Sequence, residues 1–201
     1  MASTKASMEA RMNLELKASA PATTWAAANL DEALISALAE YSRAKPYQLV
    51  TTQQPTAREM QIFPTQELIR VRRIWFPYTA SKPEYPPSWI DFDFWSDNGS
   101  FWVLLHTDSV PDGTKVMRVF YDGVHSLNGL NGFGTTTFIA SDESCIVMGA
   151  CGYACLQRSV ELDESLANMA VSTPNYGALA DLYFQRFHDM LYTNRSRGLE
   201  I

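Results

Sequence analysis

An uncharged, largely apolar stretch between residues 145 and 156 predicts a helix at the centre of the fold. It lies within the run S-D-E-S-C-I-V-M-G-A-C-G-Y-A-C-L-Q-R-S-V, which spans Ser141 to Val160. Ser141 can cap a helix start, and the two acidic residues after it lie where the helix dipole favours negative charge. Apolar side chains then surround the helix axis, which is typical of a helix buried on all sides. Because a bilayer span takes about 20 apolar residues, we expect other helices and a sheet to surround this one.

Three small residues share one side of this predicted helix. Cys145, Gly149 and Gly152 are spaced i, i+4 and i+7. Each glycine costs about 1 kcal/mol relative to alanine in a helix interior. Close packing against a neighbouring element must offset that cost, so these three positions are predicted packing residues.

Two further segments show helical periodicity. Apolar residues recur every three or four positions through residues 30–41, and Pro46 ends the pattern, which predicts a helix within residues 23–46. A second apolar stripe covers residues 176–191. We therefore expect residues 138–194 to hold two long C-terminal helices.

Residues 1–22 have two possible structures. Met8, Met12 and Leu16 have helical spacing, which favours a short amphipathic helix. A composition rich in Ala, Ser and Lys is equally typical of a mobile N-terminal arm. The segment shows no continuous apolar core of a secretory signal, so we expect a protein that is made and assembled in the cytoplasm.

The middle of the chain changes to a β pattern punctuated by prolines. Residues 68–76 and 90–95 alternate between apolar and charged side chains, which predicts strands. Asn98-Gly99 follows the second of these and is a strong hairpin signal. Return strands are expected at residues 101–105 and 115–121, which gives an antiparallel sheet of about four strands.

These patterns together predict an α+β fold in a single domain. It consists of a helical bundle, formed by the N-terminal helix and the two long C-terminal helices, with the antiparallel sheet inserted. The expected organisation is an arm at 1–22, a helix at 23–46, an inserted β-region at 47–127, a Gly/Asn loop at 128–137, helices at 138–194 and a tail at 195–201.

Four tryptophans lie in or beside the predicted sheet. They are Trp75, Trp89, Trp95 and Trp102. An isolated sheet of this size cannot bury so many large rings. We expect some of them to contact another chain.

The densest basic cluster lies on the same predicted sheet. Arg70, Arg72 and Arg73 fall within four positions of each other. They form either a solvated strand face or a positive rim that meets an acidic partner or a passing nucleic acid. The net charge of −6 argues against a primary role in gripping nucleic acid through its phosphates.

No residue pattern predicts an enzyme, a metal site or a cofactor. All three cysteines lie in the central helix, and no second Cys or His pair nearby completes the four ligands of a zinc site, so we expect reduced thiols that pack as small apolar residues. No nucleophile elbow, H-E-x-x-H or phosphate loop accompanies the histidines. Of these, His125 is expected to hydrogen-bond the loop that follows it.

The order of elements resembles a known family. The runs A-L-I-S-A-L-A-E-Y-S-R-A-K-P (33–46), V-F-Y-D-G-V-H-S-L (119–127), T-T-F-I-A-S-D-E-S (136–144) and Y-G-A-L-A-D-L-Y-F-Q-R-F (176–187) are similar in type and order to segments of head–tail adaptor, or connector, proteins of tailed phages and related gene-transfer particles. The resemblance covers residues 23–192.

The resemblance implies a structural protein of the virion neck, assembled in the host cytoplasm. It implies a homo-oligomeric ring, typically of twelve subunits, that joins the portal protein to a tail or stopper protein. DNA would pass through the ring without sequence-specific binding, and no membrane is involved. It further implies that the C-terminal tail inserts into the portal, through Arg195, Arg197, Leu199 and Ile201.

A second hypothesis belongs to another class of protein. The tryptophans of the predicted sheet could form a small binding module that stacks on a glycan or another flat ligand.

Overall fold

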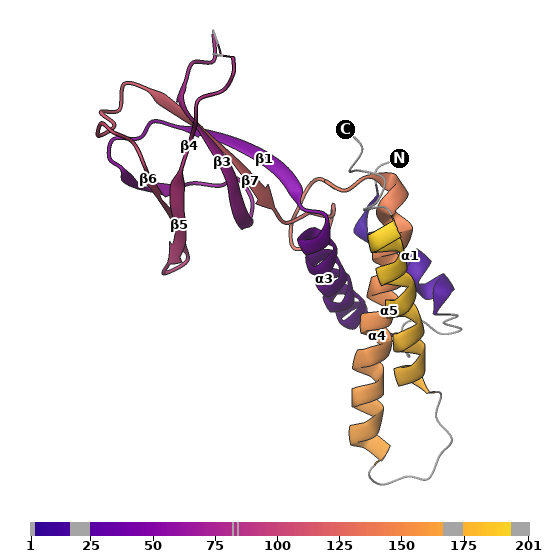
Figure 1. The fold of residues 1–201 in the computed structure, drawn as a ribbon. Helices are drawn as coiled ribbons and strands as arrows, with labels where there is room; N and C mark the ends of the chain where they lie inside the picture. The colour runs from indigo at the N-terminus through magenta and orange to yellow at the C-terminus, as the bar shows by residue number, and fades with distance from the viewer. Residues whose placement is uncertain (1–2, 17–24, 82, 84, 167–174, 194–201) are drawn as a thin grey trace. The chain divides into compact units, whose positions relative to one another are not determined.

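The computed structural model describes residues 3–16, 25–81, 83, 85–166 and 175–193 (Figure 1). The chain divides into two compact units. One unit is built from residues 46–124 and contains every strand described below; we call it the β unit. The other is built from residues 1–45 and 125–201; we call it the helical unit, and each unit is described by itself.

The helical unit is organised around one long helix. Its elements are α1 (Lys5–Glu15), α3 (Ala27–Ala44), the 3-10 turn η1 (Ala140–Asp142), α4 (Glu143–Leu166) and α5 (Tyr176–Thr193). Helices α1, α3 and α5 all contact α4. The predicted central helix is therefore present, although Leu156 on it is 44% exposed, so the helix is not enclosed on every side over its whole predicted length.

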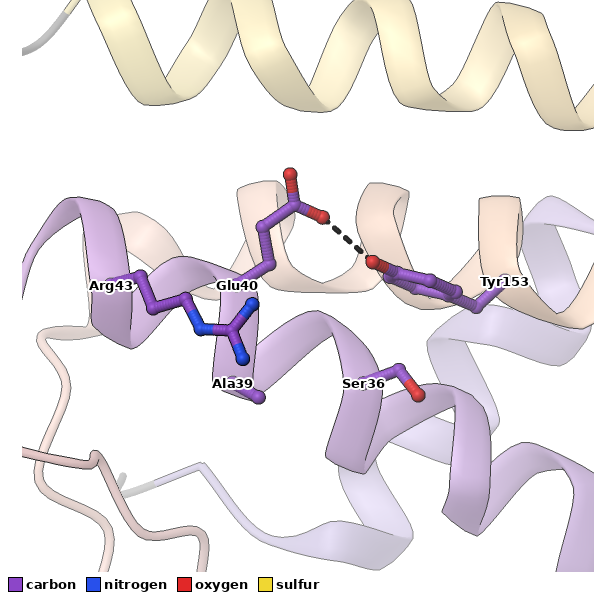
Figure 2. A pocket seen from close by; sticks show the side chains of 5 residues that line it. All are labelled: Ser36, Ala39, Glu40, Arg43 and Tyr153. Carbon is purple, nitrogen blue, oxygen red and sulfur yellow. Dashed lines mark hydrogen bonds between the residues drawn. The ribbon is translucent and has the colours of Figure 1, made fainter. Parts of the chain in front are cut away.

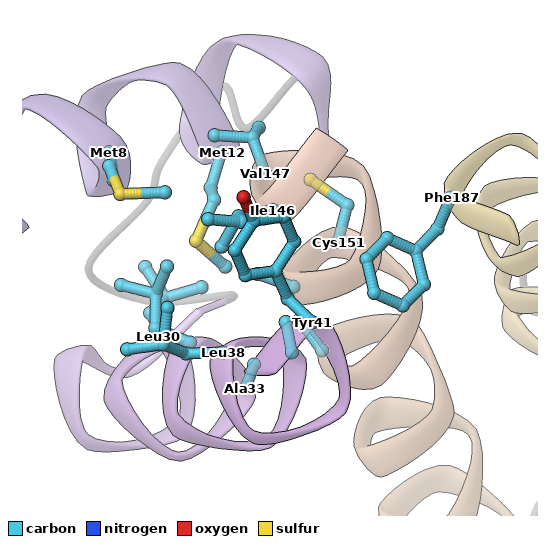
Figure 3. Packing of buried hydrophobic residues seen from close by; sticks show 14 of the residues in the cluster. Met8, Met12, Leu30, Ala33, Leu38, Tyr41, Ile146, Val147, Cys151 and Phe187 are labelled. Carbon is cyan, nitrogen blue, oxygen red and sulfur yellow. The ribbon is translucent and has the colours of Figure 1, made fainter. Parts of the chain in front are cut away.

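The hydrophobic core of this unit forms where α1, α3 and α5 meet α4 (Figure 3). The apolar stripe of α3 faces inward, and Ala33, Leu34 and Ala37 are fully buried. Of the two structures considered for residues 1–22, the described part is helical, and α1 buries Met8 and Met12 completely. A reciprocal pair of hydrogen bonds between Thr4 and Ser7 caps its start.

The small residues of α4 receive aromatic rings from α5. A side-chain Cβ built at Gly149 would lie 3.0 Å from Cδ2 of Phe187 and 3.2 Å from Cβ of Ala37, which belongs to α3. At Gly152 it would lie 2.9 Å from the ring of Phe184. Cys145 is buried on the same side, with its Sγ 3.8 Å from the Phe187 carbonyl oxygen. Close packing against α5, and at Gly149 also against α3, thus offsets the conformational cost of the glycines.

Replacing Gly149 with leucine is expected to lower the melting temperature of the helical unit. The new side chain has no room between Phe187 and Ala37, and overpacking costs about 1–3 kcal/mol. The helix regains about 1 kcal/mol when the glycine is lost, which leaves a net loss of up to about 2 kcal/mol. Each kcal/mol corresponds to about 2–4 °C in a chain of this size.

A matched control for this variant lies on the same helix. Val160 is 52% exposed, so Val160→Leu should leave the melting temperature unchanged. Equal melting temperatures for Gly149→Leu and wild type would show that the small-residue side of α4 is not a packing surface.

The β unit contains two antiparallel sheets. The first has the strand order β1-β7-β3-β4 and the second β2-β6-β5. The strands are β1 (Tyr47–Gln53), β2 (Glu59–Ile62), β3 (Leu68–Tyr78), β4 (Trp89–Ile90), β5 (Phe92–Asp97), β6 (Ser100–Leu105) and β7 (Val116–Gly123). The hairpin predicted at Asn98-Gly99 joins β5 to β6, with φ of 47° and 75°. Buried residues of both sheets form one core.

The fold predicted from the sequence is wrong in its particulars. Instead of one sheet of about four strands, the described residues form seven strands in two antiparallel sheets, and four helices in place of three. The architecture is α+β only in this coarser sense. The two long C-terminal helices are partly matched, because α4 starts at Glu143 after a 3-10 turn and residues 167–174 lie outside the described part.

Candidate functional site

All four tryptophans of the β unit lie on outer faces of its sheets. Ile74 and Val103 are fully buried in the core between the sheets. Successive residues of a strand point to opposite faces, so Trp75, which follows Ile74, and Trp102, which precedes Val103, lie on the outer faces. Register places Trp89 beside Trp75 and Trp95 beside Trp102. The four predicted contact residues are thus two pairs, one on each sheet.

The outer face of the four-stranded sheet carries arginines stacked on aromatic rings. We call it the arginine–aromatic face and define it by Arg70, Arg72, Arg73, Trp75, Tyr78, Trp89, Arg118, Phe120 and Asp122. The guanidinium carbon of Arg73 lies 5.3 Å from the Trp89 ring centroid. That of Arg118 lies 5.0 Å from the centroid of Tyr78 and 5.3 Å from that of Phe120. Such cation–π contacts hold the guanidinium groups over the aromatic rings of this face.

A buried carboxylate fixes the other two arginines. Asp122 is fully buried, and its Oδ2 accepts a hydrogen bond of 2.7 Å from Arg70 Nε. Arg72 Nη1 lies 3.7 Å from its Oδ1. A carboxylate without solvent contact requires such compensation. The three arginines predicted as contact residues therefore lie on one face, two of them tied to Asp122 and the third stacked on Trp89.

A groove of about 500 Å³ runs over this face. It is lined by residues of β1, β3, β4 and β7, which include Val50, Arg72, Arg73, Trp89 and Phe120. Trp89 is 44% exposed and Val50 is 41% exposed, whereas Trp75 beneath them is 8% exposed. The groove therefore offers both apolar surface and guanidinium groups.

Two buried polar atoms of this face have no hydrogen-bond partner among the described residues, Asp122 Oδ1 and Trp75 Nε1. The indole Nε1 of Trp75 is buried and finds no acceptor among the described residues. The ring contacts Tyr78 and Trp89, at centroid distances of 4.9 Å and 6.1 Å. A buried donor without an acceptor costs free energy.

Four residues of the face were missed from the sequence. They are Tyr78, Arg118, Phe120 and Asp122. The last three alternate along β7, which is the signal of a shared strand face. Their meeting with the arginines of β3 depends on strand register, which the sequence does not specify. That register pairs Arg70 with Asp122 and Arg73 with Phe120.

Trp95 and Trp102 form a separate aromatic pair. They lie directly opposite each other on β5 and β6, on the outer face of the three-stranded sheet. Both are partly exposed. Adjacent rings on a strand pair can serve as a platform for a flat group.

The helical unit carries a polar groove between α3 and α4 (Figure 2). It is lined by Ser36, Ala39, Glu40, Arg43 and Tyr153. Glu40 accepts a 2.8 Å hydrogen bond from the Tyr153 hydroxyl, and His188 Nε2 lies 2.8 Å from its other oxygen. Burial, followed by the bond to Glu40, raises the pKa of Tyr153 to about 12, so the phenol stays protonated at neutral pH. This arrangement holds the helices together and presents no activated nucleophile.

A buried polar cluster ties the loop after the β unit to the end of α3. Asp142 accepts hydrogen bonds of 2.6 Å from the Tyr41 hydroxyl and 2.9 Å from Lys45 Nζ. His125 lies 3.0 Å from the Thr137 hydroxyl, which confirms its predicted bond to the loop that follows it. Burial lowers the pKa of His125. Its Nε2 lies 2.9 Å from the Lys45 carbonyl oxygen. A neutral, enclosed imidazole with a carbonyl and a hydroxyl as partners is a structural group.

The cysteines are chemically inert. All three are buried, and burial raises the pKa of Cys145 and of Cys155 to about 11 and that of Cys151 further. A protonated, enclosed thiol is neither a nucleophile nor a ready metal ligand. Among the described residues, no three Cys, His, Asp or Glu side chains are grouped so that they could hold a metal ion.

Two further sequence predictions concern the termini and the membrane. Arg195, Arg197, Leu199 and Ile201, the predicted portal-binding tail, lie outside the described residues. Within the part of the chain that the structure describes, no helix is both long enough and apolar enough to cross a membrane.

The arginine–aromatic face is therefore the strongest candidate site, and its chemistry is that of a contact surface. Neither a protein-family model nor a curated protein sequence matches this chain.

Proposed function

We propose that this chain is a non-enzymatic structural adaptor of a tailed-phage virion. In this role it forms a ring in the virion neck, typically of twelve subunits, that joins the portal to the tail or stopper and lets DNA pass. The four sequence runs named above support the proposal by their resemblance to connector proteins. Such a ring is assembled in the host cytoplasm before it becomes part of the particle.

One structural observation carries the proposal furthest. The four tryptophans of the β unit lie on the outer faces of its two sheets, and four arginines share the face of Trp75 and Trp89, whereas Ile, Leu, Val and Met side chains fill the core together with Tyr121. Tryptophan and arginine are the residue types most enriched at the energetic centres of protein interfaces. Ring contacts between identical subunits join two different patches, and the two tryptophan pairs lie on different sheets. A role in assembly thus explains why Trp89 is 44% exposed and why Trp95 and Trp102 are only partly buried.

The test is assembly with a portal ring. The purified chain, mixed with the portal of the same particle, should form a stoichiometric complex in native mass spectrometry. The number of copies of this chain in the complex should equal the number of subunits in the proposed adaptor ring. A strict monomer that never binds the portal would overturn the proposal.

A second candidate function rests on the pair Trp95 and Trp102. Their side-by-side placement on an outer face also suits a binding module that stacks on sugar rings or another flat ligand. Tryptophan fluorescence titrated with a glycan panel tests it, with Trp102→Ala as the comparison. An unchanged emission across the panel removes this candidate.

A further inference from the structure

The arginine–aromatic face concentrates positive charge in an acidic chain. It combines four arginines with one carboxylate, whereas the whole chain has a net charge of −6. Asp122 is paired with Arg70 and lies near Arg72. Among the described residues, no carboxylate forms an ion pair with Arg73 or Arg118. The face therefore has guanidinium charge left to pair with an anionic partner.

The guanidinium groups of this face already occupy ring surfaces. Arg73 lies over Trp89, and Arg118 lies over Tyr78 and Phe120. A base of single-stranded nucleic acid would need these ring surfaces for stacking. Arg118 Nη1 donates a 3.2 Å hydrogen bond to the Tyr78 hydroxyl. The remaining N–H groups of Arg73 and Arg118 have the fork geometry that matches a carboxylate. This favours an acidic protein segment over unstacked bases.

The groove adds an apolar requirement. Val50 and Trp89 are both about four-tenths exposed along it. The buried N–H of Trp75 lies under the same cluster without an acceptor. A partner that offers only negative charge would leave the apolar side chains of the groove exposed to water. An apolar side chain flanked by carboxylates matches the groove on both counts.

We propose that the arginine–aromatic face binds an acidic segment of a partner protein, in which carboxylates flank an apolar side chain. The carboxylates pair with Arg73 and Arg118, and the apolar side chain packs on Val50 and Trp89. This inference rests on the adaptor proposal only for the idea that another protein covers this face. Its partner is defined by chemistry, and it can be tested without the portal.

The test is a titration of the full chain with a capped synthetic peptide of the sequence Glu-Glu-Phe-Glu-Glu. Binding should change tryptophan emission, because Trp89 lies in the groove. Arg73→Ala and Arg118→Ala should each weaken the affinity about tenfold or more, as expected when a charge-assisted hydrogen bond is lost. Arg186→Ala is the matched control, since Arg186 is exposed on α5 in the helical unit. It should bind like wild type.

Several outcomes would overturn the inference. One is an absence of binding; another is equal binding of the peptide with glutamines in place of glutamates. Tighter binding of an oligothymidylate would assign the face to nucleic acid. Self-association that is lost in Arg73→Ala, measured by sedimentation, would assign it to a second copy of this chain. Portal binding that survives in a chain that ignores the peptide would reject this inference alone and leave the adaptor proposal standing.

Discussion

Replacing Phe187 with alanine will lower the free energy of unfolding of the helical unit by about 3–5 kcal/mol, as removal of a fully buried phenylalanine does. Phe187, which belongs to the core drawn in Figure 3, has no exposed surface, and its ring lies 3.0 Å from the point where a Cβ on Gly149 would be. Gly149 has no side chain that could move into the cavity. Helix α4 cannot shift to close it without losing contacts with α3. Urea unfolding followed by the helical circular dichroism signal measures the loss, because all described helices belong to this unit.

A control and a rescue sharpen this prediction. Leu182 lies on the same helix and is 43% exposed, so Leu182→Ala should change stability far less. In the double variant Gly149→Leu with Phe187→Ala, the new leucine should occupy the vacated space. Its destabilisation should therefore be smaller than the sum of the two single changes. Strict additivity would contradict the packing of Phe187 against Gly149.

The sequence predicts the helical core well because its signals are local. The small residues of α4 and the apolar stripe of α3 are spaced by the period of a helix. Helix α3 ends at Ala44, its C-cap is Lys45, and the predicted stop, Pro46, comes next. The conformation of the loop before α4 was harder to predict, because hydrogen bonds to residues far away in the sequence fix it. The backbone N–H of His125, for example, donates to the Ser42 hydroxyl.

Strands β1, β2 and β4 were missed because they carry weak signals, and the division into two sheets was missed with them. Strand β1 carries Thr and Gln on both of its faces, so it lacks a clear contrast between apolar and polar faces. Strand β4 has only two residues. The partition of strands between two sheets depends on long-range pairing, which local periodicity does not encode.

The candidate site was predictable in its residue types and not in its geometry. The four tryptophans were predicted as contact residues because a sheet of the expected size is too small to bury their rings. The three arginines of β3 were predicted because they are close together in the sequence. The bulges in the pairing of β3 with β7 place Arg72 and Arg73 in succession on the exposed side. Stacking of Arg118 and burial of Asp122 follow from that same register and had no signal in the sequence.

Replacing Asp142 with alanine will destabilise the helical unit by about 3 kcal/mol at neutral pH. The Tyr41 hydroxyl, which is buried, would lose its acceptor, and a buried donor without a partner costs about 1–3 kcal/mol. Lys45 would lose its ion pair, although its side chain is 24% exposed and regains part of its hydration. The loop of residues 125–142 would lose one of its ties to α3.

The pH dependence of this loss identifies its cause. Burial alone would raise the pKa of Asp142, but hydrogen bonds from Tyr41 and Lys45 and the charge of Lys45 outweigh it, so the pKa lies below the usual value. A lowered folded-state pKa stabilises the fold above the unfolded pKa of about 3.9 and ceases to do so as pH falls through the folded value. The difference between wild type and Asp142→Ala should therefore be full at pH of about 7 and shrink below pH of about 4. Urea unfolding at both pH values measures it, with Asp181→Ala, an exposed change on α5, as the control. A difference that stays constant with pH would mean that Asp142 acts through shape, and that its charge contributes nothing to the fold.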